Sequence, residues 1–296
     1  MRAYLPQYEM KSPKNLLEAL KILKDEENVW MPFAGGTDLM VLFEAGKLSH
    51  DRFLNLLELN ELKGISITPD TVTLGALTTY TEIQNHPLLQ KEFPLLCQAA
   101  FETGAVAIQN RGTLGGNIVN ASPAADSPPA LLVYDARLEL ISVLGSRWVD
   151  YAAFHTGYKK TLLMRGELLA RIELPRKILA CVGFASSKSS NGYFQYYKKV
   201  GTRKAQAISK TCFAGILKKE GKQIIDIRIA LGSVAPTVIR CKKTESFLIG
   251  KLISPQTIEK SKQILSQEIA PIDDLRSTQA YRMQVTANLL ESFLSR

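Results

Sequence analysis

Two glycines follow a short apolar stretch near the start of this 296-residue chain, in the segment Phe33-Ala34-Gly35-Gly36-Thr37-Asp38-Leu39. Glycine has no Cβ atom, so the backbone N–H groups of such a pair can approach a bound group closely. A helix is expected from Leu39 onward, and a helix N-terminus adds partial positive charge. The segment therefore fits an anion-binding loop, although a tight turn between a strand and a helix explains the same residues.

A second glycine pair lies in Arg111-Gly112-Thr113-Leu114-Gly115-Gly116-Asn117. Ten residues after Gly116 is Asp126, at the expected start of another helix. A carboxylate at this place can accept a hydrogen bond from a ribose or ribityl hydroxyl group, or it can simply cap the helix. The local sequence leaves both explanations open.

Neither glycine pair matches a standard nucleotide-binding signature. The sequence has no G-x-x-x-x-G-K-[ST] motif, which excludes a P-loop, and no G-x-G-x-x-G between a strand and a helix, which leaves a Rossmann site unsupported. Gly36 and Gly116 are 80 positions apart. Two separate glycine turns of this kind would suit a diphosphate group that is held from two sides.

The composition sets limits on the class of protein. Hydrophobic residues make up 46% and charged residues 22%, which is typical of a globular protein and excludes a disordered or collagen-like chain. The net charge of +9 suits an anionic cofactor, an acidic protein surface or nucleic acid, but the basic residues form no single block, so we do not expect nucleic acid. No segment resembles a signal peptide or a membrane span, so we expect a cytoplasmic protein with no membrane partner.

The cysteines and histidines give no sign of a metal site or of a catalytic group. No two of the four cysteines are closer than 29 positions, whereas zinc and iron–sulfur sites use clustered ligands. We therefore expect buried thiols and no bound metal. The histidines stand apart without an obvious base or nucleophile partner, so no catalytic residue is assigned. The cysteines are Cys97, Cys181, Cys212 and Cys241, and the histidines are His50, His86 and His155.

Apolar periodicity, capping residues and turn signals indicate the elements that must position these residues. In the first helix Ser12 is the expected N-cap and Pro13 the first residue, and Thr37 is the expected N-cap of the helix after the first glycine pair. Thr79 or Thr81 should cap a short helix, and residues 109–120 read as irregular. We expect helices over residues 13–23, 39–45, 79–85, 94–103, 125–132, 255–267 and 277–295, and strands over residues 29–33, 53–57, 65–68, 72–75, 137–143, 168–174, 193–200, 208–217 and 224–232.

The order of these elements predicts an α+β protein, because three successive strands are followed by two helices without βαβ repetition. The segment 186–192 is rich in Ser, Asn and Gly and reads as a loop. We place a domain boundary between residues 176 and 182.

Taken together, the motifs resemble the FAD-binding subunit of the molybdenum hydroxylases, the family of xanthine dehydrogenase, aldehyde oxidase and carbon monoxide dehydrogenase. The resemblance rests on several motifs in one order and covers nearly the whole chain. They are residues 34–39, 110–117, 121–126, 166–175, 197–208 and 230–237, together with Tyr281 and Arg282.

The resemblance implies a two-part architecture and a bound FAD. The FAD-binding domain, of the PCMH or vanillyl-alcohol-oxidase-like type, would span residues 1–177 in two subdomains, about 1–57 and 58–177. A C-terminal domain with a three-stranded antiparallel sheet and helices would span residues 182–296. The residues implied in FAD binding are Phe33, Ala34, Gly35, Gly36, Thr37, Asp38, Leu39, Thr113, Leu114, Gly115, Gly116, Asn117, Asp126, Leu169 and Lys199.

The resemblance also implies a role for individual side chains. The two glycine segments would hold the diphosphate, and Asp126 would meet a sugar hydroxyl group. Leu169 would pack near the flavin, and Lys199 would sit beside the isoalloxazine, where an ammonium group favours the anionic reduced ring. An aromatic ring between Tyr193 and Tyr197 could cover one flavin face, or these rings could pack in the core of a strand pair.

In function, the resemblance implies an electron-transfer subunit of a hetero-oligomer. A molybdopterin-binding large subunit and a 2Fe-2S small subunit would be the partners, and electrons would pass from the iron–sulfur clusters through FAD to NAD or another acceptor. One alternative is a stand-alone FAD-dependent oxidase of the vanillyl-alcohol-oxidase type. Another is a basic binding module without a cofactor, whose binding would fall steeply with salt.

Overall fold

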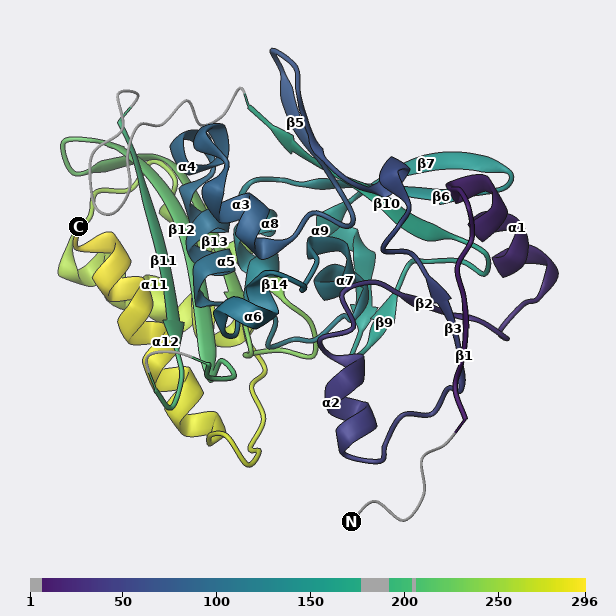
Figure 1. Cartoon of the computed structure of the whole chain (residues 1–296). Helices are drawn as coiled ribbons and strands as arrows, with labels where there is room; N and C mark the ends of the chain where they lie inside the picture. The colour runs from purple at the N-terminus through teal and green to yellow at the C-terminus, as the bar shows by residue number, and fades with distance from the viewer. Residues whose placement is uncertain (1–6, 177–191, 204–205) are drawn as a thin grey trace.

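The computed structural model describes residues 7–176, 192–203 and 206–296 and arranges them in three successive regions (Figure 1). Each region is built around a sheet. The first contains a three-stranded sheet, the second a five-stranded sheet with a set of short helices, and the third a four-stranded sheet with longer helices. The expectation of a mixed helix and strand protein is confirmed.

The first sheet is parallel, with strand order β1-β3-β2. Helix α1 packs its apolar face against it, with Leu20 and Leu23 buried next to Trp30 and Leu54. Helix α2 follows β2 directly. The bounds are β1 Glu9–Lys11, α1 Leu16–Asp25, β2 Met31–Phe33, α2 Leu39–Glu44 and β3 Arg52–Asn55.

The second sheet is antiparallel, with order β4-β5-β10-β6-β7, and β10 lies at its centre. A 3-10 helix (Asn60–Leu62) precedes it, and the two-stranded sheet β8-β9 follows α9. The strands are β4 Ile65–Ile67, β5 Thr71–Gly75, β6 Arg137–Ser142, β7 Gly145–Asp150, β8 His155–Gly157, β9 Lys160–Thr161 and β10 Leu168–Pro175. The helices are α3 Tyr80–Asn85, α4 Pro87–Glu92, α5 Pro94–Glu102, α6 Val106–Gln109, α7 Leu114–Val119, α8 Ser127–Val133 and α9 Tyr151–Phe154.

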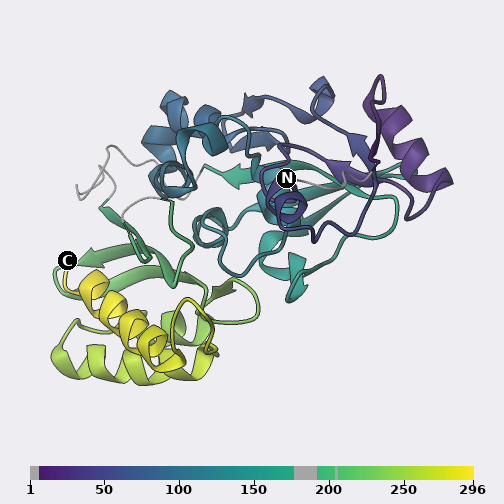
Figure 2. The same cartoon turned by 60° about the horizontal axis from the view of Figure 1, so that its bottom comes forward.

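The third sheet has order β11-β12-β13-β14 and is antiparallel throughout. Figure 2 shows it between the yellow helices on one side and the blue helices of the central region on the other. The expected three long strands are present, but the two-residue strand β14 adds a fourth. The bounds are β11 Tyr193–Val200, β12 Thr211–Glu220, β13 Gln223–Gly232, β14 Ile239–Arg240, α10 Lys242–Leu248, α11 Pro255–Glu268 and α12 Gln279–Leu294.

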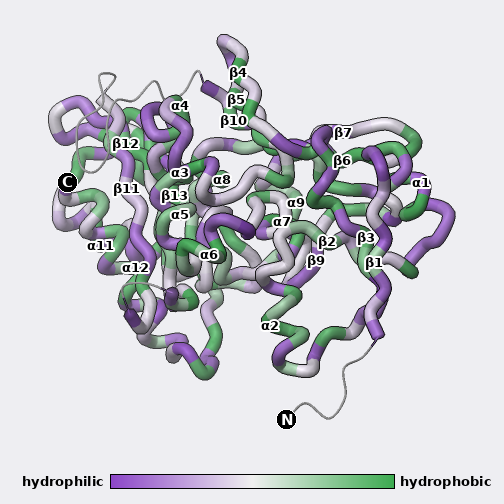
Figure 3. Tube along the Cα trace, viewed as in Figure 1, coloured by the Kyte–Doolittle hydropathy of each residue, from purple (hydrophilic) through white to green (hydrophobic). Residues whose placement is uncertain are grey.

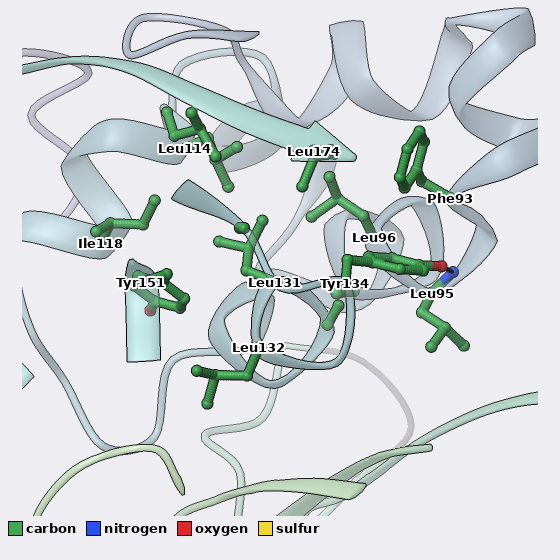
Figure 4. Close-up of a cluster of buried hydrophobic side chains, with 14 of the residues drawn as sticks. Phe93, Leu95, Leu96, Leu114, Ile118, Leu131, Leu132, Tyr134, Tyr151 and Leu174 are labelled. Atoms are coloured by element: carbon green, nitrogen blue, oxygen red, sulfur yellow. Dashed lines mark hydrogen bonds between the residues drawn. The ribbon is translucent and has the colours of Figure 1, made fainter. Parts of the chain in front are cut away.

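The largest core lies among the central helices and joins them to both neighbouring sheets. Figure 4 shows Leu114 and Ile118 of α7, Leu131 of α8 and Leu174 of β10 turned toward one another. Cys212 and Ala214 of β12 belong to the same cluster. The α7–α8 region is therefore packed between the five-stranded sheet and the C-terminal sheet.

Helix α2 differs from the other helices in its surroundings. Five of its six residues are hydrophobic (Figure 3), yet none of them is buried. Met40 and Val41 are 48% and 65% exposed. The helix that follows the first glycine pair thus presents accessible apolar side chains.

Three local expectations were wrong. Helix α1 begins at Leu16 with Asn15 as its N-cap, because the Asn15 side chain accepts from Glu18 N (2.9 Å), while Ser12 Oγ accepts from Asn55 instead. Asp38, not Thr37, is the N-cap residue of α2. The irregular stretch expected over residues 109–120 contains helix α7, whose apolar residues are too few to show a period.

One further expectation was confirmed, and two others fall on residues outside the described ranges. The capping box at Thr79, in which its hydroxyl and Glu82 bond each other's backbone N–H, is present at the start of α3. The domain boundary expected between residues 176 and 182, and the loop over residues 186–192 except its last residue, lie outside the described residues.

Candidate functional site

The first glycine pair forms the loop between β2 and α2. Gly36 has φ +72°, in the left-handed region that favours glycine. A Cβ atom on Gly35 would lie 1.9 Å from the carbonyl oxygen of Arg111. Only glycine allows this close approach, so the loop is held directly against the segment that precedes α7.

The second glycine pair lies in the first turn of α7. Thr113 is the N-cap, and its side chain accepts from Gly116 N at 3.1 Å. Leu114 N donates to Thr78 O, Gly115 N to Ala76 O and Asn117 N to Thr113 O. The N–H groups of residues 114–117 therefore all have acceptors within the chain.

The two glycine pairs converge in space (Figure 1). A Cβ atom on Gly116 would lie 4.0 Å from Cβ of Ala34, so only a small gap separates the α7 N-terminus from the first loop. Within the described residues, the backbone N–H groups of residues 35–38 donate no hydrogen bond. These N–H groups are the donors that remain available for an anion at this point.

A buried ion pair lies at the start of α8, whose N-cap is Asp126. Lys199, near the end of β11, donates from Nζ to Asp126 Oδ2 at 2.7 Å and to Glu102 O at 2.9 Å. The two side chains are only 7% and 10% exposed. A residue of the C-terminal sheet is thus bound to one from the central region. Helix α8 is also in direct contact with α7, which carries the second glycine pair.

Two side-chain oxygens at the site have no hydrogen-bonding partner within the described chain. They are Asp126 Oδ1 and Asn117 Oδ1, and both are buried. Burial raises the pKa of Asp126 to about 6, and the nearby Lys199 opposes this shift. Because buried polar atoms are seldom left unpaired, these two acceptors are candidates for contact with the hydroxyl groups of a ligand.

The aromatic cluster of β11 is divided between the two faces of its sheet. Phe194 and Tyr196 pack with Phe213 and Phe293 in the C-terminal core, as the core-packing interpretation expected. Tyr197 faces the central region, where its hydroxyl donates to Asp126 O at 3.0 Å. It contributes to the site through a hydrogen bond to the main chain.

Leu169 lies in β10 and is buried in the large central core. The next residue, Ala170, falls in the irregularity between Leu169 and Arg171 and accepts from Ala76 N, while Ala76 O accepts from Gly115 N. The strand is thereby connected to the first turn of α7. Leu169 presents little surface, as the residue is 6% exposed.

Sequence reasoning missed three contributors to the site. Arg111 and Gly112 supply the backbone against which the first loop packs, and Glu102 supplies the carbonyl oxygen that binds Lys199. The Tyr197–Asp126 bond was also missed. Arg111 and Gly112 lay within the second motif, but nothing in the sequence marks the contacts of Glu102 or Tyr197, which join residues 97 and 71 positions apart.

Comparison with known proteins identifies the family of this chain. A family model described as the FAD binding domain in molybdopterin dehydrogenase matches residues 6–177. A second, the CO dehydrogenase flavoprotein C-terminal domain, matches residues 195–296. The chain belongs to the FAD-binding subunits of molybdopterin dehydrogenases. It is an FAD-dependent oxidoreductase subunit, and the resemblance seen in the sequence is confirmed.

The relatives of this FAD-binding subunit match along its length. The glyceraldehyde dehydrogenase medium chain of Sulfolobus acidocaldarius is 33% identical, with 95% of each chain covered. The xanthine dehydrogenase FAD-binding subunit of Escherichia coli O157:H7 is 30% identical, covering 95% of this chain and 92% of that one. A solved structure of carbon monoxide dehydrogenase from Hydrogenophaga pseudoflava superposes with a TM-score of 0.88 at 27% identity, covering 98% and 96%.

The residues present fit FAD. The molecule carries a diphosphate, sugar hydroxyl groups and an apolar ring system, and the site offers free backbone donors at residues 35–38 and unpaired acceptors on Asn117 and Asp126. Cys97, Cys212 and Cys241 are buried, as expected, while Cys181 is not described. Among the described residues no cluster of metal-binding side chains occurs, and no helix is long and apolar enough to cross a membrane.

Proposed function

We propose that this subunit carries FAD in a molybdenum hydroxylase complex, taking electrons from a 2Fe-2S small subunit and passing them to NAD. The relatives support a place in such a complex: one is a carbon monoxide dehydrogenase medium chain from Hydrogenophaga pseudoflava, and the solved carbon monoxide dehydrogenase of that organism is described as a form that lacks the Mo-pyranopterin moiety of its molybdenum cofactor. A molybdopterin-binding large subunit would oxidise the substrate. Another acceptor in place of NAD would leave the role of this chain unchanged.

The observation that carries the proposal is the convergence of the two glycine pairs. In this proposal the N–H groups of residues 35–38 hold the diphosphate, with the first turn of α7 closing the other side. Phe33, Leu39 and Leu114 support this loop and turn. Asn117 and Asp126 accept from sugar hydroxyl groups, and Leu169 lies toward the ring.

No general acid or base is needed from the protein. When bound, FAD supplies the exchange between one-electron and two-electron chemistry. The chain itself binds the diphosphate through backbone donors, orients the sugar through buried acceptors, and sets the charge near the ring through the Lys199–Asp126 pair. The work of the site is binding, orientation and electrostatic tuning.

The domain division is part of the proposal. The FAD-binding domain would end at residue 177, with subdomains of about 1–57 and 58–177 and a fold of the PCMH type, and the C-terminal domain would begin at residue 182. The separate three-stranded and five-stranded sheets support the first division. The matched ranges of the two family models support the second.

The first test is a bulky residue at Gly116. A Gly116→Val side chain would displace the Thr113 hydroxyl, which lies 2.8 Å from the Cβ position, and would enter the gap toward Ala34. We expect FAD affinity to fall at least about tenfold while the fold survives. Gly157→Val is the control for a valine placed in open space, because a Cβ atom there meets only Lys160 Cδ at 3.8 Å. FAD titration of the full-length proteins, with circular dichroism as a check on folding, measures both.

A second pair of variants separates ligand binding from backbone strain. Gly36→Ala and Gly221→Ala both place alanine at positive φ, +72° and +58°, and share that backbone cost, while the Gly36 variant also brings a Cβ atom to 2.4 Å from the Phe33 ring. Only the Gly36 variant should lose FAD. Wild-type flavin content in both the Gly116 and the Gly36 variants would refute the proposed diphosphate site.

The comparisons favour neither alternative function. A stand-alone oxidase would turn over a small alcohol as an isolated chain, and a cofactor-free module would be colourless and bind in a salt-dependent manner.

Rapid mixing of the reduced complex with NAD or with oxygen would identify the acceptor. Reoxidation by NAD at a rate matching turnover is the expected result.

A further inference from the structure

Lys199 already uses two of its three N–H donors before any ligand is considered. Its ammonium group contacts Asp126 Oδ2 and Glu102 O, from two different elements of the central region, and the side chain is 7% exposed. A buried ammonium group without partners is strongly unfavourable. Two of the three N–H bonds of the ammonium group thus hold Lys199 to the central region, and one remains for a further acceptor.

Asp126 uses only one of its two carboxylate oxygens for hydrogen bonding within the described chain. Its Oδ2 atom binds Lys199, whereas Oδ1 is buried and has no partner within the described residues. An ionised carboxylate has acceptor sites on both oxygens. The unused oxygen therefore identifies the side of Asp126 on which a ligand's donor would bind.

We propose that Lys199 is a positioning residue, which fixes Asp126 through one carboxylate oxygen so that the other accepts a hydroxyl group from the sugar chain of FAD. The inference rests on the proposed FAD site and specifies how one lysine serves it. In this proposal Lys199 acts on FAD through Asp126.

A second bond from the same strand supports this role. Tyr197 precedes Lys199 by two residues and so lies on the same face of β11. Its hydroxyl donates to Asp126 O at 3.0 Å and accepts from Cys212 Sγ at 3.2 Å. Strand β11 consequently fixes both the main chain and the side chain of Asp126, while the adjacent Lys198 is exposed.

The charge on Asp126 gives the proposal a measurable signature. Burial raises its pKa to about 6, and Lys199 lowers it. Removal of Lys199 should therefore move the pKa further upward, by roughly 1–3 pH units for a close opposite charge. The titratable groups that face Asp126 from the packed elements are Lys199 and Tyr197 of β11, Glu102 of α5, Cys212 of β12 and Tyr80 of α3.

The test is the pH dependence of FAD affinity, measured by titration of the full chain between about pH 5 and pH 8. Wild-type affinity should fall as the pH drops below about 6, because a protonated Asp126 is the poorer acceptor. Lys199→Met should shift this midpoint upward. Asp126→Asn should remove the dependence, and the double variant should show the flat profile of Asp126→Asn.

Lys198→Met is the matched control, since it removes a lysine from the opposite face of the same strand, and its midpoint should equal that of the wild type. If Lys199→Met does not fold, Lys199→Gln retains a hydrogen-bond donor and should show the same upward shift. A Lys199 variant that weakens binding equally at every pH, with or without Asp126, would overturn the inference. Failure of the proposed function would give a different result from failure of this inference: the wild type would then bind no FAD at any pH.

Discussion

At the scale of single residues, the site depends on groups that the fold leaves with unused bonding capacity. The N–H groups of residues 35–38 and Oδ1 of Asp126 have no partners within the described chain. Their types and positions were predictable, because glycine pairs and an aspartate near a helix start are visible in the sequence. The sequence did not predict which N–H groups would be free. Those of the first turn of α7 are already bonded to acceptors such as Thr113 and Ala76, through contacts that depend on packing.

The raised pKa of Asp126 predicts how stability of the FAD-free chain depends on pH. The folded-state pKa of about 6 exceeds the ordinary value of 3.8. Between these two pH values Asp126 therefore carries a proton in the folded state that it has lost in the unfolded chain. The contribution of Asp126 to the free energy of unfolding therefore falls as the pH rises from about 4 to about 7, by up to about 3 kcal/mol. Asp126→Asn should remove this part of the slope.

Urea unfolding at several pH values measures the effect. The comparison must use the slope with pH, because Asp126→Asn also leaves Lys199 without its anionic partner at every pH in this range. Identical slopes for the wild type and Asp126→Asn would show that Asp126 is not protonated in the folded state near pH 6.

At the scale of elements, helix α8 is held at both ends by the C-terminal sheet. Lys199 and Tyr197 bind Asp126 at its start. At its end, Arg228 donates to Val133 O and to Asp135, and Arg240 donates to Leu132 O and to Asp135. These arginines supply donors to the carbonyl groups that a helix C-terminus leaves unpaired.

Arg240 provides the prediction at this scale. It also pairs with Glu245, and both side chains are under 10% exposed. Arg240→Ala should lower the free energy of unfolding by about 3–5 kcal/mol, because it leaves a buried carboxylate without its partner. Adding Glu245→Gln should recover part of the loss, since the uncompensated charge is then gone.

Arg137→Ala is the matched control for denaturant unfolding. Arg137 is 47% exposed and its nearest carboxylate oxygen, in Glu173, is 3.4 Å away, so its loss should cost no more than about 1 kcal/mol. Similar losses for Arg240→Ala and Arg137→Ala would contradict the view that Arg240 forms a stabilising buried ion-pair network beside the end of α8.

The elements themselves were predictable to different degrees. Long periodic segments such as β12, β13, α11 and α12 were recognised from their patterns. Helix α7 was not, because a six-residue helix with two glycines has neither a period nor favourable propensity, and its conformation depends on the Thr113 cap and on packing. Strand β14 has two residues and exists only through pairing with β13.

At the scale of the whole molecule, the order of the regions along the chain places the candidate site where they meet. The first loop comes from the β1-β3-β2 region, α7 and α8 come from the central region, and Lys199 comes from the C-terminal sheet. The family followed from motif order in the sequence, and the mixed helix and strand class followed from the order of the expected elements. The meeting of the three regions did not, since it depends on contacts between residues 73 or more positions apart, such as Gly35 with Arg111 and Asp126 with Lys199.

The most direct test of this account is a structure of the full chain with FAD bound. The account predicts the paired phosphates within hydrogen-bonding distance of the N–H groups of residues 35–38, and a sugar hydroxyl group bound to Asp126 Oδ1 while Lys199 keeps its bond to Oδ2. Phosphates bound elsewhere, with the loop after β2 making no contact with FAD, would contradict it.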